Sequence, residues 1–416
     1  MTYTVLRGQF VIRYPDLPRQ GPEPDGDTVK FLPDTPALVE TLPRPSGHPA
    51  AINARGISVR LEAIDALETH FAETHQELGG ADAARDQLLR ILGFTNVLFY
   101  PDTPNKVASA DQDSVRGHVL SNGIDANGRM IGFVYPGEYA GSDGATVYLD
   151  TTKVDESANA MLLEEGLVYP AFYATLPGSL RKHLSALSRH ARDAAAGIWA
   201  RSVATPDAAA TVTDPTGLQQ VAMWPKLFRR LVPYLATGTG SLDGFGAWLR
   251  ADPVNRDDAV FLLDRLEDGN LHDVIRASGH RVQLTAWPED FIIQPDPAPP
   301  GGSTAPTGLV AGDVLIVAAL PDPAGTDRGQ ELVTLLNTTA APIDLAGWRL
   351  HDTRGWQDLT GTLDAGTTVQ FAAQAQVHLG NRGDTLMLMD PKGITIDHVT
   401  YDEKQVQEGR TICFGR

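Results

Sequence analysis

The stretch Arg60-Leu61-Glu62-Ala63-Ile64-Asp65-Ala66-Leu67-Glu68 decides which fold the first part of this chain adopts. Polar and hydrophobic residues alternate over residues 57–63 of the strand-like run 57–64, which predicts a strand whose neighbouring side chains point to opposite faces. We expect this strand to end near Asp65 and the chain to turn after it. Spacing along a strand cannot bring Arg60 and Glu68 together without such a turn.

The sequence on either side of this stretch predicts a mixture of strands and helices over residues 1–203. Strands are predicted at residues 3–11, 29–32, 57–64, 115–120, 130–135 and 147–149. Helical spacing of apolar residues predicts helices at residues 81–92, 157–165 and 180–199. Glu62 is expected to be a solvated residue of its strand.

Two further polar clusters lie where predicted strands begin. Asp25-Gly26-Asp27-Thr28 opens one strand, and Gly128-Arg129 follows a predicted turn at residues 125–127 and begins another. Phosphodiester hydrolysis needs a cation to neutralise the phosphate, a base to orient water, and rigid donors for the phosphate oxygens. With residues 60–68, these clusters contain acids and arginines suited to each of these tasks.

The order of these clusters resembles the staphylococcal nuclease family over nearly all of residues 20–203. The matching pieces are Asp25-Gly26-Asp27-Thr28, residues 60–68, Asn127-Gly128-Arg129-Met130, residues 159–168, and both ends of the last helix at Leu180-Arg181-Lys182 and Gly197-Ile198-Trp199. Each piece alone is a weak signal, whereas five in the family's order are a strong one. The resemblance implies a five-stranded barrel similar to an OB-fold, with helices around it and a site at its rim.

The resemblance also implies a calcium site. Asp27 and Asp65, together with the backbone carbonyl of Ala66, are the positions that match the family's Ca²⁺ ligands. All three supply oxygen atoms, which are the ligands that this hard cation prefers. The expected cofactor is therefore Ca²⁺.

Three further positions match the family's catalytic side chains. Glu68 is implied to orient or deprotonate the attacking water, and Arg60 and Arg129 are implied to hold the phosphate and stabilise the transition state. The implied activity is hydrolysis of DNA or RNA with little sequence preference, which leaves 3′-phosphate ends. Phe172 stands where the family has a tyrosine, with Tyr173 beside it.

A second interpretation is a catalytically weak, nuclease-like module that binds nucleic acid or protein. The chain carries 52 acidic and 34 basic residues, a net charge of −18, and more acidic than basic residues in every segment. Contact with a polyanion must then depend on a few aimed arginines or a bound metal, since overall electrostatic attraction is excluded. Retention of all five catalytic side chains favours the enzyme.

Other features of the composition narrow the class of protein. Cys413 is the only cysteine, which excludes an intramolecular disulfide and a zinc site built from cysteines. No apolar stretch approaches the roughly 20 residues that a membrane helix needs, so membrane insertion is not expected. The N-terminus shows no signal-peptide pattern, so we expect a cytoplasmic protein or one exported by a non-standard route.

Residues 204–294 are expected to form a mostly helical region of unknown role. Helical spacing is seen in Leu227, Leu231 and Leu235, and again in Val260, Leu263 and Leu266. A strand is predicted at residues 281–287, and no catalytic motif is found. We expect residues 1–203 to fold and cleave without this region. A Pro/Gly-rich linker is predicted at residues 295–310.

The last segment, residues 311–416, predicts an all-β sandwich. Short alternating runs are separated by Gly, Pro and Asp turns. Residues 313–401 resemble the lamin tail domain, an immunoglobulin-like fold, and Trp348 and Leu350 are expected to face its interior. In bacteria such domains accompany nucleases and other hydrolases, so the resemblance implies a module that binds a protein or surface partner. The fold class expected for the whole chain is multidomain α+β.

Overall fold

The computed structural model describes residues 2–44, 47–238, 240–253, 255–294, 312–325, 329–339, 342–374, 376–391 and 395–414. The chain divides into two compact units, Thr2–Ser303 and Thr304–Arg416. The predicted linker, residues 295–310, lies outside the described residues.

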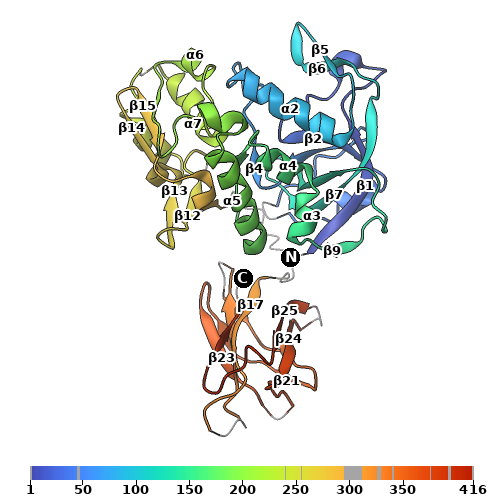
Figure 1. Cartoon of the computed structure of the whole chain (residues 1–416), viewed down its shortest axis with the longest axis vertical. Helices are drawn as coiled ribbons and strands as arrows, with labels where there is room; N and C mark the ends of the chain where they lie inside the picture. The colour runs from blue at the N-terminus through green and yellow to red at the C-terminus, as the bar shows by residue number, and fades with distance from the viewer. Residues whose placement is uncertain are drawn as a thin grey trace. The chain divides into compact units, whose positions relative to one another are not determined.

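The first unit is built around a closed five-stranded barrel (Figure 1). Its strands, in the order in which they pair, are β1 (Thr2–Val11), β2 (Thr28–Pro33), β3 (Ile57–Leu61), β8 (Met130–Pro136) and β7 (Ser114–Ile124). The barrel closes because β1 pairs with both β2 and β7, and only the β3–β8 pair is parallel. A short strand, β9 (Thr146–Tyr148), extends the sheet beside β1. The strand order and the closure of the sheet confirm the predicted five-stranded barrel similar to an OB-fold.

Strand alternation explains the barrel interior. Every second side chain of β2 and β3 is buried, which places Phe31 and Val59 in the core. The short connecting elements are η1 (Pro18–Gln20), α1 (Pro36–Val39), β4 (Ile64–Asp65), β5 (Leu98–Tyr100), β6 (Thr103–Ser109) and β10 (Tyr169–Pro170).

The main helices of this region are α2 (Leu78–Leu92), α3 (Thr151–Asp155), α4 (Ala158–Glu164) and α5 (Gly178–Asp193). Helix α4 packs against α2, α5 and β8. The buried side chain of Asn159 joins α4 to the barrel, because it bonds the backbone N–H of Val134 and the carbonyls of Glu62 and Gly132. The predicted helix at 180–199 ends earlier, at Asp193, and a separate 3-10 helix, η2 (Gly197–Arg201), follows.

The middle region contains both helices and strands. The helices are α6 (Pro215–Leu218), α7 (Pro225–Leu235), α8 (Phe245–Arg250), η3 (Leu271–Val274) and η4 (Pro288–Asp290). Two three-stranded sheets accompany them. One consists of β11 (Ala210–Thr211), β15 (Arg281–Leu284) and β14 (Ile275–Ser278), and the other of β13 (Glu267–Asn270), β12 (Ala259–Leu262) and β16 (Phe291–Ile293).

The helical expectation for this region is correct only in its first half. Leu227, Leu231 and Leu235 lie on α7 and are buried. Val260 lies in β12, whereas Leu263 and Leu266 follow in a turn, so no helix forms there. Three apolar residues at helical spacing cannot distinguish a helix from a strand and its turn. Of the strand predicted at 281–287, only Arg281–Leu284 forms, as β15.

The middle region shares a hydrophobic core with the first 203 residues. Leu67, Tyr169 and Trp199 belong to the same buried cluster as Leu227 and Phe228. Isolated β-bridges also connect the two segments, and one of them joins Ser202 to Ala222. This packing brings α7 to the rim of the barrel. It also argues against independent folding of residues 1–203.

The second unit is all-β in its described residues. Its two four-stranded sheets are β23 (Thr368–Ala372), β18 (Leu332–Asn337), β17 (Val314–Leu320) and β26 (Ile412–Cys413), and β21 (Trp356–Asp358), β20 (Arg349–His351), β24 (Gly383–Met389) and β25 (Thr395–Asp402). A two-stranded ladder joins β19 (Ile343–Asp344) to β22 (Thr362–Leu363). Trp348 and Leu350 are buried between the sheets, as predicted.

Candidate active site at the barrel rim

All five predicted catalytic and metal-binding side chains line one cavity of about 420 Å³. They are Asp27, Arg60, Asp65, Glu68 and Arg129. Strand pairing explains how these distant residues meet. Thr28 in β2 lies opposite Arg60 in β3, and Arg60 lies opposite Ile131 in β8, so the three polar clusters of the sequence stand side by side.

Asp27 is positioned by the close approach of its loop to helix α2. A Cβ atom on Gly26 would lie 2.6 Å from the Cβ of Ala66 and 2.8 Å from that of Ala84. Only glycine allows this contact, which explains the glycine between the two aspartates. One carboxylate oxygen of Asp27 accepts a hydrogen bond from Thr28 Oγ1 at 3.1 Å, and the other lies 3.5 Å from the backbone N of Ala66.

The chain turns earlier than expected between Arg60 and Asp65. Strand β3 ends at Leu61, Glu62 and Ala63 form a turn, and Ala63 has a φ of 71°. Asp65 then lies in β4, opposite Tyr169 of β10. The predicted continuous strand to residue 64 is therefore wrong, and this early turn aims Asp65 back toward Arg60. Their nearest side-chain nitrogen and oxygen are 3.9 Å apart.

Glu68 and Arg129 are held by neighbouring side chains. The backbone N–H of Glu68 donates to Gln76 Oε1 at 3.1 Å. Arg129 donates from Nε and from its backbone N–H to Asp125, each at 2.8 Å. The turn before Arg129 requires glycine, since Gly128 has a φ of 76°.

Sequence reasoning missed two cations that the middle region brings to this cavity. Lys226 and Arg229 of α7 both line it. Arg229 Nη2 donates to both oxygens of Asp65, at 3.0 and 2.9 Å, and Arg229 Nη1 hydrogen-bonds Glu68. Lys226 Nζ donates to Asp258 at 2.6 Å. No motif marks these residues, because only the packing of α7 on the barrel places them there.

Tyr173 forms one wall of the cavity. Its hydroxyl accepts a hydrogen bond from Arg60 Nη1 at 3.4 Å, and the guanidinium carbon of Arg60 lies 5.2 Å from its ring centroid. Burial by itself raises the pKa of Tyr173, but the nearby charges of Arg60 and Lys226 outweigh this effect and lower it. Tyr173 therefore contacts Arg60, one of the two arginines predicted to bind phosphate.

The acids of the cavity repel one another. The pKa of Glu68 is raised from 4.5 to about 7, chiefly by burial; Asp27 and Asp65 add to this effect and Arg229 opposes it. Burial and the charge of Asp65 raise the pKa of Asp27, although nearby arginines partly offset this. A carboxyl that titrates near neutral pH is suited to accept a proton from water.

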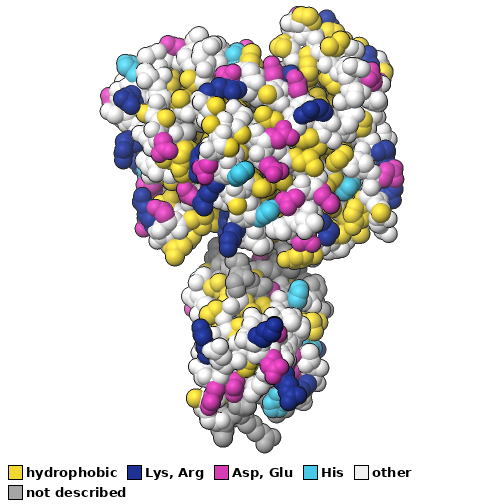
Figure 2. Space-filling model, viewed as in Figure 1, with side chains coloured by type: hydrophobic (Ala, Val, Ile, Leu, Met, Phe, Trp, Pro, Cys, Tyr) yellow, Lys and Arg dark blue, Asp and Glu magenta, His cyan; other side chains and the backbone are white. Residues whose placement is uncertain are grey.

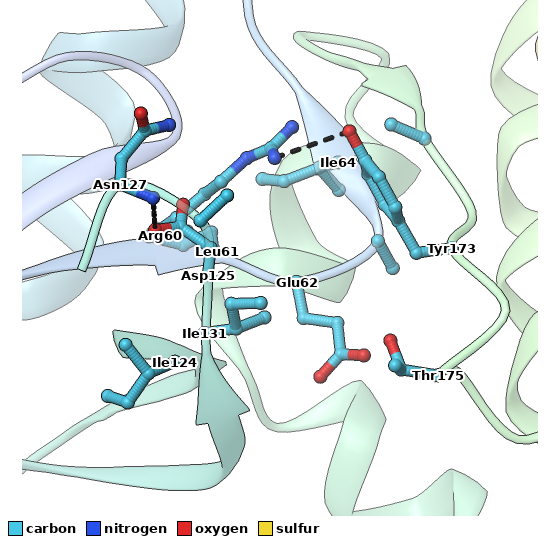
Figure 3. Close-up of a pocket in the computed structure, with 13 residues that line it drawn as sticks. Arg60, Leu61, Glu62, Ile64, Ile124, Asp125, Asn127, Ile131, Tyr173 and Thr175 are labelled. Atoms are coloured by element: carbon cyan, nitrogen blue, oxygen red, sulfur yellow. Dashed lines mark hydrogen bonds between the residues drawn. The ribbon is translucent and has the colours of Figure 1, made fainter. Parts of the chain in front are cut away.

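A smaller cavity of about 100 Å³ adjoins the first, and Arg60 and Tyr173 line both (Figure 3). Glu62 reaches into it among apolar side chains that include Ile124 and Ile131. Glu62 is only 5% exposed, so its expected role as a solvated strand residue is wrong. The turn at Glu62 and Ala63 removes Glu62 from the regular alternation of the strand.

The burial of Glu62 predicts a pH-dependent loss of stability. Burial raises the pKa of its carboxyl from 4.5 to about 7, although Asn122, Tyr3 and Arg60 partly oppose this effect. The folded state therefore binds this proton more tightly than the unfolded state. The protonated Glu62 carboxyl therefore stabilises the folded state fully below about pH 4.5, and this stabilisation is lost as the pH rises through 7.

Glu62→Gln should remove this dependence, because glutamine is a neutral side chain of the same shape as the protonated acid. At pH 8 the variant is expected to be more stable than the wild type by up to about 3 kcal/mol, and at pH 5 the difference should be much smaller. Urea unfolding of both proteins at the two pH values measures it. Glu73→Gln, at an exposed position, is the control. An equal difference at both pH values would contradict the prediction.

The donor chemistry of the cavity suits a hard cation. Asp27, Asp65 and the carbonyl of Ala66 would supply oxygen ligands, as the resemblance to staphylococcal nucleases implies. Within the described parts of the chain, no group of three or more His, Cys, Asp or Glu side chains is arranged to hold a metal ion. A cation here would therefore rest on two carboxylates and a carbonyl, and one carboxylate, Asp65, is already bonded by Arg229.

Figure 2 shows Lys and Arg side chains interspersed with Asp and Glu side chains on the face in view. None of the described helices is long and apolar enough to cross a membrane.

The fold and cavity define a multidomain α+β protein with a closed barrel, a charged site at the barrel rim, and a separate all-β module. Residues 309–403 match the family model of the Lamin Tail Domain. This match confirms the prediction for the C-terminal module. A comparison with curated proteins finds no match. The resemblance of residues 20–203 to staphylococcal nucleases stays a prediction.

Proposed function

We propose that this protein is a calcium-dependent phosphodiesterase that hydrolyses DNA, RNA or both with little sequence preference. One observation carries the proposal: five side chains from separate parts of the sequence meet in one cavity. They combine acids with arginines in the way that phosphoryl chemistry requires. A barrel that serves only as a scaffold has no physical need to gather them.

In the proposed reaction, Arg60 and Arg129 bind the phosphate oxygens through their planar guanidinium groups. Glu68 accepts a proton from a water molecule, whose oxygen then attacks phosphorus. The bond from phosphorus to the 5′ oxygen breaks, that oxygen takes up a proton from solvent, and Glu68 later returns its proton to solvent. The products are a 3′-phosphate and a 5′-hydroxyl.

Calcium would be held by Asp27, Asp65 and the Ala66 carbonyl. When bound, such an ion neutralises phosphate charge as a Lewis acid. The side chains of the cavity orient the phosphate and move the proton. Tyr173, which packs against Arg60, limits how that guanidinium can turn.

The decisive experiment is to incubate the purified protein with plasmid DNA and with RNA, in Ca²⁺ or in chelator. Cleavage in Ca²⁺ that stops in chelator supports the proposal. Full activity in chelator would refute the calcium requirement, and absence of cleavage under both conditions would refute the enzyme.

A second candidate function is a catalytically weak module that binds nucleic acid or protein. The contacts of Arg229 favour it, because Asp65 and Glu68 are already satisfied by a guanidinium. This candidate predicts binding of oligonucleotides, or of a protein, with no turnover in either medium. The same incubation therefore separates the two functions.

The lamin tail module is proposed to bind a protein or surface partner. In its described residues the distinctive side chains, such as Trp348 and Leu350, serve the core of the sandwich. The module would then hold the protein at its partner, and catalysis would take place in the first unit.

A further inference from the structure

Arg229 contacts two acids of the candidate site. It bonds both oxygens of Asp65 and one oxygen of Glu68. The side chains of Arg229, Asp65 and Glu68 are 20%, 1% and 14% exposed. Charge pairs sheltered to this degree are screened little by salt and persist across ordinary ionic strengths.

Helix α7 holds Arg229 in a defined place. The neighbouring residues Leu227 and Phe228 are fully buried in the core shared by the barrel and the middle region. The two other cations on this stretch of helix, Lys226 and Arg230, both bond Asp258 of the middle region. Arg229 alone among these three cations bonds the carboxylates of the barrel.

A divalent cation and Arg229 need the same oxygen atoms. The proposed calcium ligands include Asp65, and both Asp65 oxygens already accept hydrogen bonds from Arg229. A positive guanidinium at this distance also repels a second cation, and the repulsion is strong where water is scarce. Binding of one cation must therefore weaken binding of the other.

We propose that Arg229 is a built-in competitor of the divalent cation, so that the middle region sets the calcium affinity of the barrel site. The inference rests on the proposed calcium site. In low calcium the guanidinium neutralises Asp65 and Glu68 and keeps the cation out. In high calcium the ion displaces Arg229 from Asp65, and the site becomes competent for hydrolysis. Residues 204–294 thereby acquire a role that no motif in them indicates.

The test measures calcium binding directly, by titration calorimetry of the full chain with CaCl₂ alone. Arg229→Met removes the charge and keeps much of the side-chain volume. It is expected to bind Ca²⁺ at least about tenfold more tightly than the wild type, because the guanidinium charge that repels the ion is gone. A factor of ten in affinity corresponds to about 1.4 kcal/mol of binding free energy. Arg230→Met is the matched control, because it removes an adjacent arginine of α7 that contacts Asp258 instead. Its affinity should stay within about twofold of the wild type.

Arg229→Met leaves the carboxylates of Asp65 and Glu68 without their cation, which destabilises the fold. A second, milder variant is therefore measured as well. Arg229→Lys keeps a charge but loses the planar fork that bonds both Asp65 oxygens. It should bind Ca²⁺ about threefold or more tightly than the wild type. The rise in melting temperature on adding Ca²⁺ should also be larger for either Arg229 variant than for the control.

The outcomes separate this inference from the proposed function. Tighter binding by the Arg229 variants alone supports competition. Affinities equal to or weaker than that of the wild type overturn the competition and leave the calcium site standing. If no protein, Arg229→Met included, binds Ca²⁺, the calcium part of the proposed function falls together with the inference.

Discussion

Asp27→Ala is expected to lower the rate of calcium-dependent cleavage by about 10³-fold or more. A bound metal supplies several kcal/mol of transition-state stabilisation, and each factor of ten in rate corresponds to about 1.4 kcal/mol. Asp27 is the better position to test than Asp65, because Asp65 is bonded by Arg229 and its removal would strand that cation. The measurement is the initial rate on a short oligonucleotide over a range of Ca²⁺ concentrations.

The control for this result is Arg60→Lys, which leaves both proposed carboxylate ligands in place. It should lose roughly 10²-fold in rate, the scale of a lost transition-state donor, while it keeps the calcium requirement of the wild type. Circular dichroism should show that both variants are folded. An Asp27→Ala protein that is folded, fully active and still stimulated by Ca²⁺ would remove Asp27 from the proposed metal site.

Truncation after residue 203 is expected to unfold the barrel unit. The cut exposes Leu67, Tyr169 and Trp199, which are buried against residues 204–294. Exposure of three large side chains costs about 1.5–3 kcal/mol each, which together approaches the whole stability of an ordinary domain, about 5–15 kcal/mol. Thermal unfolding and solubility of the truncated chain measure the effect.

The comparison for this truncation is a chain that ends at residue 303, which keeps the whole first unit. This longer chain should melt cooperatively and cleave short oligonucleotides about as fast as the full protein. If residues 1–203 alone melt as sharply and at the same temperature, the shared core contributes little. The expectation from sequence, that residues 1–203 stand alone, would then hold.

Much of the barrel follows from local patterns. The strand-like runs at residues 3–11, 29–32, 115–120 and 130–135 all lie in strands. Over residues 57–61 polar and apolar side chains alternate, and the pleat sends them to opposite faces of β3. The same logic fails at Glu62, where a turn breaks the alternation and buries an acid that the pattern assigns to solvent.

The sequence by itself predicted five of the side chains that line the rim cavity, because the order of its short motifs resembles the staphylococcal nuclease family. It also determined the all-β module of the C-terminus, whose turns and alternating runs are local features. Only the tertiary structure decided that Arg229 reaches Asp65 and Glu68. The physical reason is that apolar burial packs α7 onto the barrel, and burial depends on which surfaces meet in space and not on spacing along the chain.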